Sequence, residues 1–145
     1  MPKFTEGTLP QQSMAHKIFR IYPENRALYF QVIVWDTRRE MYGANSDRRP
    51  PFKAICRGHE LIRDGKKSGS CGVVHFCKRE LGSGLISHEF FHAVLVWARR
   101  VGLGFAEIAS DEVGDATPAE ERLCYAHSEM VRQFVARCYE TGILE

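Results

Sequence analysis

The first half of the chain alternates short hydrophobic segments with turn-forming residues, a pattern typical of β-strands. Four segments rich in β-branched and aromatic residues are predicted to be strands: residues 17–22, 28–35, 52–56 and 71–76. The turn Pro23-Glu24-Asn25 makes the first two a hairpin. Residues 43–51 and 64–70 are dense in Gly, Pro, Asp and Ser, so they are expected to be surface loops.

The second half changes to a helical period. Residues 84–100 (GLISHEFFHAVLVWARR) carry apolar side chains around nearly the whole circumference, which predicts a helix buried in the middle of a small domain. Gly102 and Gly104 are expected to end this helix. A poorly periodic, acidic linker, residues 105–116, then leads to the next element.

A second helix has a well-marked start. Thr117 is a suitable N-cap residue, Pro118 fits the first helical position, and Glu120 completes a T-x-x-E capping box. Apolar residues then recur at spacings of three and four, as in a helix with one packed face: Leu123, Met130, Val131, Phe134, Val135 and Cys138. Strands followed by helices predict an α+β fold, in which a small antiparallel or mixed sheet of about four strands packs on two main helices.

Length and composition indicate a single domain. The chain has 145 residues, 44% of them hydrophobic, and is expected to fold as one unit over residues 1–145, in which residues 1–16 can form a flexible N-terminal segment. No uninterrupted apolar segment reaches about 18 residues, and no secretory signal is evident, so we expect a soluble, cytoplasmic protein without membrane contact. Its 5 cysteines, which form no C-x-x-C pair, are expected to be reduced.

The near-neutral total charge hides an asymmetry along the chain. Residues 1–80 contain 15 Lys and Arg against 8 Asp and Glu, a net of +7, whereas residues 81–145 contain 5 against 10, a net of −5. A basic half can face a phosphate backbone or an acidic partner. Because the basic residues are dispersed, a solvated sheet face is the favoured interpretation, and nucleic acid is not an expected partner.

The predicted buried helix contains His88-Glu89-Phe90-Phe91-His92, an H-E-x-x-H pattern. Residues four apart lie one above the other on a helix, so His88 and His92 can hold one ion, as a zinc site requires. Glu89 projects beside that ion and can take a proton from a metal-activated water. The alternative is a pair of satisfied core histidines, or a helix face exposed in a groove. Zinc is favoured because each of three desolvated polar groups without a partner would lower the stability of the fold by about 1–3 kcal/mol, and one cation would be a partner for all three.

A catalytic zinc site also needs a third protein ligand and one open position. The downstream candidates are Glu107, Asp111, Glu112, Asp115, Glu120, Glu121 and His127. Those in the linker are expected on exposed backbone, and a ligand is better held on a helix, which favours the two adjacent glutamates. Glu120 points nearer the centre of the apolar face but serves the capping box, whereas Glu121 lies at the margin of that face.

At this point the sequence resembles the gluzincin branch of zinc metallopeptidases, in which a second helix supplies a glutamate within Glu-x-x-[Ala/Ser]-Asp. The segment Glu121-Arg122-Leu123-Cys124-Tyr125 matches with the small Cys124, but Tyr125 stands where the family often has Asp. The segment is also similar to small zinc-peptidase-like proteins of bacteriophages and bacteria. The resemblance covers residues 71 to about 138 and favours Glu121 over Glu120 as the third ligand.

The resemblance implies a zinc-dependent peptidase. Zn²⁺ would be held by His88, His92 and Glu121, while Glu89 would act as general base and acid as metal-activated water attacks a peptide bond of a protein or peptide substrate. The alternative is a zinc-stabilised, catalytically weak protein-binding module, which the small size of the domain favours and the presence of Glu89 does not. A nucleic-acid-associated factor is a third hypothesis, which no motif supports.

The same resemblance implies a place for the substrate. The strand that precedes the active helix, residues 71–76, would form the sheet edge along which an extended substrate pairs. His75 within it can reach the cleft, although a solvent-facing position is favoured. The donor that stabilises the negative charge of the reaction stays open among His75, Tyr125 and His127, and for His127 a packed core position is the default.

Overall fold

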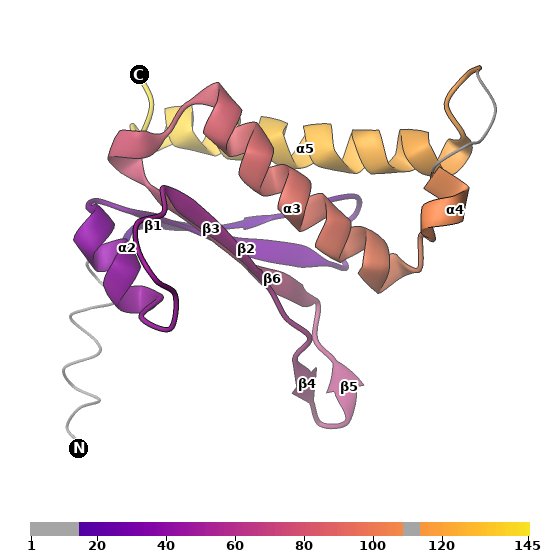
Figure 1. Cartoon of the computed structure of the whole chain (residues 1–145), viewed down its shortest axis with the longest axis horizontal. Helices are drawn as coiled ribbons and strands as arrows, with labels where there is room; N and C mark the ends of the chain where they lie inside the picture. The colour runs from indigo at the N-terminus through magenta and orange to yellow at the C-terminus, as the bar shows by residue number, and fades with distance from the viewer. Residues whose placement is uncertain (1–14, 109–113) are drawn as a thin grey trace.

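The computed structural model describes residues 15–108 and 114–145. Within these ranges the chain forms an α+β fold, with a four-stranded mixed sheet in its N-terminal half and its two long helices in the second half (Figure 1). The fold class predicted from the sequence is confirmed. The flexible segment expected at the N-terminus lies, up to residue 14, outside the described residues. No helix among the described residues is long and apolar enough to cross a bilayer.

The sheet has the strand order β1-β2-β6-β3. Its strands are β1 (Ala15–Ile21), β2 (Tyr29–Trp35), β3 (Ala54–Gly58) and β6 (Ser70–Cys77). The first two form the predicted antiparallel hairpin, β2 pairs with β6 in parallel, and β6 pairs with β3 in antiparallel orientation. All four strands that the sequence predicts are therefore present.

Strand β6 is a central strand, and β3 lies at the edge of the sheet. This corrects the expectation that residues 71–76 form the edge that receives substrate. The physical reason lies in β6 itself, because all but one of its eight residues are buried. A strand that is apolar on both faces is typical of the interior of a sheet.

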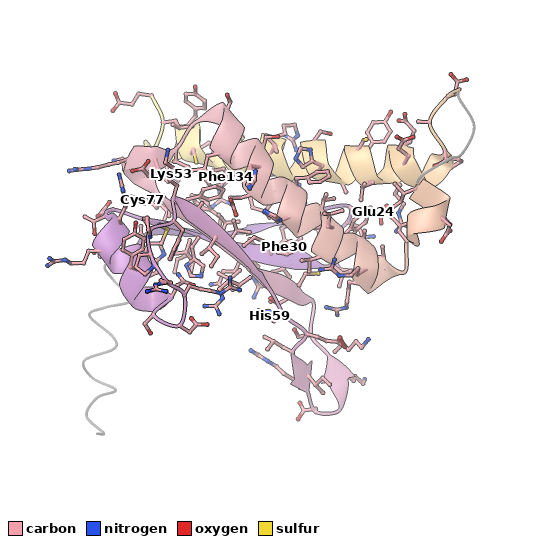
Figure 2. The ribbon with its side chains drawn as sticks, viewed as in Figure 1. Glu24, Phe30, Lys53, His59, Cys77 and Phe134 are labelled. Carbon is pink, nitrogen blue, oxygen red and sulfur yellow. The ribbon has the colours of Figure 1, made fainter. Side chains whose placement is uncertain are left out.

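The main core lies between one face of the sheet and the two long helices, α3 (Ser83–Val101) and α5 (Pro118–Glu140). Phe134 of α5 stacks on Phe76 of β6 with ring centroids 4.9 Å apart, and it contacts Phe90 of α3 at 5.5 Å. Phe134 and the buried Phe30 of β2 both belong to this layer (Figure 2). These aromatic contacts fix the position of α3 relative to the sheet.

The opposite face of the sheet carries a smaller hydrophobic cluster of Trp35, Met41 and Cys77. Helix α2 (Arg38–Ala44) covers it, and the sequence analysis missed this helix. The Thr37 hydroxyl accepts a hydrogen bond from the Glu40 backbone N–H, and the Glu40 carboxylate accepts one from the Thr37 N–H, a complete capping box. Four short elements were missed as well: β4 (Ile62–Arg63), β5 (Lys66–Lys67), the 3₁₀ helix η1 (Lys78–Glu80) and α4 (Phe105–Ile108).

Both long helices begin and end close to where the sequence places them. Gly102 ends α3 in the left-handed conformation with φ of 81°, and the Thr117 hydroxyl caps α5 by accepting from the Glu120 N–H. However, α3 is not surrounded by the domain as expected. His88 and His92 are exposed, because α5 covers one flank of the helix and β3 the other, which leaves a stripe of α3 open to solvent.

Candidate metal centre

One turn of α3 brings together the three residues of the H-E-x-x-H pattern. The Nε2 atoms of His88 and His92 lie 3.2 Å apart, and the ligand atoms of His88, Glu89 and His92 all lie within 4.8 Å of one another. Zinc binds imidazole nitrogens at about 2.0–2.1 Å with tetrahedral angles, which places two such nitrogens about 3.3 Å apart. The pair therefore fits a single zinc ion without rearrangement of α3.

Glu89 differs from its histidine neighbours in its surroundings. Its side chain is 8% exposed, against 64% for His88, and its Oε2 lies 3.8 Å from the His88 Nε2. Burial raises the pKa of Glu89, an effect that the nearby His92 and His88 oppose. A carboxylate with a raised pKa beside two imidazole nitrogens is suited to accept a proton near neutral pH.

The exposure of the two imidazoles changes the argument made from the sequence. We expected all three polar groups to be desolvated in a buried helix, but this holds for Glu89 alone. His88 and His92 would cost little without an ion, so their proximity and not their burial supports a metal site. Exposure also gives an ion and a substrate access to them.

The structure does not bring Glu121 to the paired histidines. Among the described residues, only Glu89 joins His88 and His92 within metal-binding distance. Glu121 is exposed and lines a different hollow, together with Pro23 and Tyr125. The alternative ligand, Glu120, likewise lies outside the cluster.

The reason is the register of α5 along α3. The two helices are antiparallel: the Arg122 guanidinium lies over the Trp97 ring at 5.3 Å, and His127 meets Ser87 farther along. Trp97 is five residues beyond His92, about 7.5 Å along the helix axis. The first turn of α5, which carries both glutamates, therefore packs beyond the turn that carries the histidines.

The remaining candidate ligands are also placed elsewhere. The Glu107 carboxylate accepts a hydrogen bond from the Gly104 N–H, and Asp115 is exposed. His127 is half-buried and donates from Nε2 to the Ser87 carbonyl at 3.1 Å, with its ring edge-on to Phe91. Two further candidates, Asp111 and Glu112, lie outside the described residues.

His75 occupies neither of the positions considered for it. It is buried on the face of the sheet opposite α3, where its Nδ1 accepts a hydrogen bond from the Trp35 indole N–H at 3.1 Å. Burial, together with the charge of Arg57, lowers the pKa of His75 to about 4. Tyr125 is 69% exposed in the hollow of Glu121. Neither residue faces the metal centre.

Two arginines that the sequence analysis did not select line the groove of the candidate metal centre. Arg48 and Arg49, in the loop after α2, line the same groove as His88, Glu89 and His92. Ala54, Ile55 and Cys56 of the edge strand β3 form its wall. The adjacent arginines were visible in the sequence, but nothing there connects them with a helix about 40 residues away.

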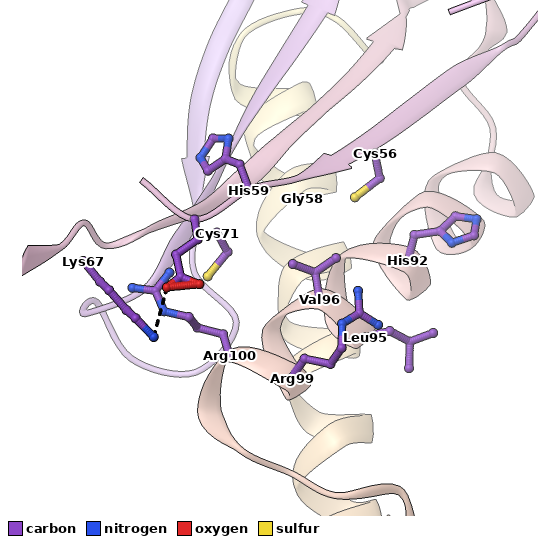
Figure 3. A pocket seen from close by; sticks show the side chains of 11 residues that line it. Cys56, Gly58, His59, Lys67, Cys71, His92, Leu95, Val96, Arg99 and Arg100 are labelled. Atoms are coloured by element: carbon purple, nitrogen blue, oxygen red, sulfur yellow. Dashed lines mark ion pairs between the residues drawn. The ribbon is translucent and has the colours of Figure 1, made fainter. Parts of the chain in front are cut away.

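Cys56 lines the same groove as Glu89. Burial is the main cause that raises the pKa of Cys56 to about 12, and the charge of Glu89 adds to it. Beyond Cys56 and His92 the groove continues into a second hollow of about 570 Å³, which also extends along α3 and the β4–β5 hairpin (Figure 3). The two hollows share Cys56 and His92, so the candidate metal centre lies beside the point where they meet along β3.

Comparisons of the chain with protein-family models, with curated proteins and with solved structures found no match. A functional conclusion therefore depends on the geometry of the groove and on the H-E-x-x-H motif.

Proposed function

We propose that this protein is a zinc-dependent peptidase in which His88 and His92 hold the ion and Glu89 is the general base. The observation that carries the proposal is a pair of exposed imidazole nitrogens 3.2 Å apart, next to a buried carboxylate and inside an open groove. A helix that only filled a core would have no need to place a buried carboxylate beside two exposed imidazoles.

The chemistry divides between the ion and the chain. When held by His88 and His92, a zinc ion would supply a Lewis acid for the substrate carbonyl and for the attacking water. Glu89 accepts the proton of that water and returns it to the leaving amine, a role for which its poorly hydrated position suits it. Arg48 and Arg49 supply positive charge in the groove, where negative charge develops on the carbonyl oxygen.

The edge strand supplies the place for a substrate. β3 pairs on one side with β6, and within the described residues no strand pairs with its other side. Its free backbone groups can therefore pair with an extended peptide, as in β-strand addition. The substrate would run alongside the free edge of β3, past His88 and Glu89.

Replacement of Glu89 by Gln tests this assignment. We expect Glu89→Gln to bind zinc as the wild type does and to lose at least about 100-fold in turnover, because the amide cannot accept the proton. The measurements are zinc content and hydrolysis of a quenched fluorescent peptide library. If Glu89→Gln cleaved peptides at the wild-type rate, the mechanism would be wrong. Loss of zinc from the variant would make Glu89 a ligand and not the base.

A zinc-stabilised protein-binding module is the second candidate function. One observation weighs against turnover: among the described residues α5 does not add the third protein ligand that a catalytic zinc site needs. This function predicts stoichiometric zinc in the wild type but no cleavage of any library peptide.

We also propose that the protein is cytoplasmic. Its five free thiols support this location.

A further inference from the structure

The second hollow of the groove, next to the metal centre, is positively charged. Its charged lining comprises Lys67, Arg99 and Arg100 against the single acid Glu60, a net of +2. The neutral form of His59 is favoured there, because burial and the charge of Arg100 lower its pKa. A hollow of this size and charge suits a small anionic group.

Two of the three cations already have partners. Lys67 forms an ion pair with Glu60 at 3.0 Å. Arg100 donates to the backbone carbonyls of Ser68 and Ser70, so it holds the base of the β4–β5 hairpin against α3. Both are therefore engaged in the structure of the hollow itself.

Arg99 is the free cation of the hollow. It is exposed, and within the described part of the chain no hydrogen bond or ion pair engages it. A cation in the last turn of a helix also stabilises the helix dipole, which is the ordinary role for this position. Figure 3 shows, however, that Arg99 is directed toward the end of the hollow that Cys56 and His92 line.

The spacing along α3 connects Arg99 with the metal centre. Arg99 follows His92 by seven residues, close to two helical turns, so both lie on one side of the helix and about 10 Å apart along its axis. An extended peptide advances about 3.3 Å per residue. A group bound by Arg99 would thus be two or three residues from the bond at the metal.

We propose that the second hollow binds a carboxylate of the substrate and that Arg99 determines this specificity. The substrate class is a peptide with a carboxylate two or three residues from the cleaved bond. That carboxylate is either an Asp or Glu side chain or the carboxyl terminus of the peptide. This inference rests on the proposed peptidase function, because it takes the groove along β3 as the path of the substrate.

The test measures binding and cleavage separately. Zinc-loaded Glu89→Gln is titrated with labelled peptides that carry either Glu or Gln two or three residues from a reference bond. The reference bond is the one that the wild type cleaves, or a central bond if the wild type cleaves none. Each peptide ends in a free carboxylate or an amide. Because bidentate guanidinium–carboxylate pairs are strong, we expect one carboxylate source to improve affinity about tenfold. Equal affinities for all four kinds of peptide would overturn the proposal.

A charge reversal assigns the effect to one residue. Arg99→Glu, in the Glu89→Gln background, should lose the preference for the carboxylate and favour a Lys peptide instead. Arg39→Glu, an equal change of charge on the exposed face of α2, should keep the wild-type preference. A loss of the same size in both variants would contradict a specific pocket, since it would show a general effect of net charge.

Two further outcomes separate this proposal from other functions. Displacement of the Glu peptide by an oligothymidylate at lower concentration than by unlabelled peptide would overturn it in favour of a nucleic-acid groove. Carboxylate-dependent binding without any cleavage by the wild type would support the hollow and contradict the peptidase. Cleavage at the same rate with and without the carboxylate would support the peptidase and contradict the carboxylate-binding hollow.

Discussion

Neighbouring residues of one helical turn are placed in opposite environments. Successive residues on an α-helix are about 100° apart, so Glu89 turns toward β3 while His88 stays in the solvent-facing stripe. His92, four residues later, returns to that stripe. The H-E-x-x-H spacing thus provides two accessible nitrogens and one desolvated carboxylate from five consecutive positions.

His75 makes the stability of the fold dependent on pH. Its pKa is lowered from 6.5 to about 4, so as the pH falls through this window the unfolded chain takes up a proton that the folded chain does not. We predict that this residue alone lowers the free energy of unfolding by up to about 3 kcal/mol between pH 6.5 and 4. The stability it contributes is fully present above pH 6.5.

Replacement of His75 by Gln tests this prediction, because the amide oxygen can accept the Trp35 N–H and does not titrate. Urea unfolding of both proteins, without zinc, should give a flatter dependence on pH for His75→Gln. Arg57, the charged group that faces His75, is unchanged in both. Parallel curves for the two proteins would show that His75 is not the titrating group.

The residues of the site differ in how far the sequence could reveal them. His88, Glu89 and His92 belong to one turn, so their proximity follows from helical geometry alone. The position of Glu121 depends instead on the register in which α5 packs along α3. The hydrophobic periodicity of α5 does not determine that register. The surroundings of Arg99 could not be read from its own segment either, because β3, β5 and β6 line its hollow together with α3.

At the scale of elements, local signals predicted the four strands of the main sheet and the two long helices but not their neighbours. β6 directly precedes α3, the place that the family resemblance gave to an edge strand, although the burial of both its faces is typical of a central strand. Helix α2 has only seven residues, too few for a visible period. Its T-x-x-E capping box was the one available signal.

The edge strand that borders the groove depends on Gly72 in β6. A Cβ atom at this position would lie 2.4 Å from the Arg57 carbonyl oxygen, which is backbone and cannot move aside. We predict that Gly72→Ala separates β3 from β6 and lowers the free energy of unfolding by about 1–3 kcal/mol. Urea unfolding measures the loss, and faster amide exchange in β3 locates it.

Gly43 is the matched control, because a Cβ atom there would meet nothing within 4 Å. It lies inside α2, so Gly43→Ala should leave stability unchanged or raise it by up to about 1 kcal/mol. Equal stability of Gly72→Ala and the wild type would contradict the close approach of the two strands.

For the whole molecule, charge is arranged in space differently from its order along the chain. The groove along β3 combines Arg48 and Arg49 from the basic half with Arg99 from the acidic half. The hollow beside the first turn of α5 instead contains Glu121 and Glu129. An acidic substrate would be attracted to the groove and repelled from these acids. Counting charged residues in the two halves of the sequence could not reveal this separation of basic and acidic surfaces.

The central claim is that His88 and His92 bind one zinc ion. The most direct measurement is the zinc content and zinc affinity of the purified wild type, His92→Ala and Glu121→Ala. We predict one zinc per chain in the wild type and in Glu121→Ala, because Glu121 lies outside the cluster, and none in His92→Ala. Retention of stoichiometric zinc by His92→Ala would contradict the account.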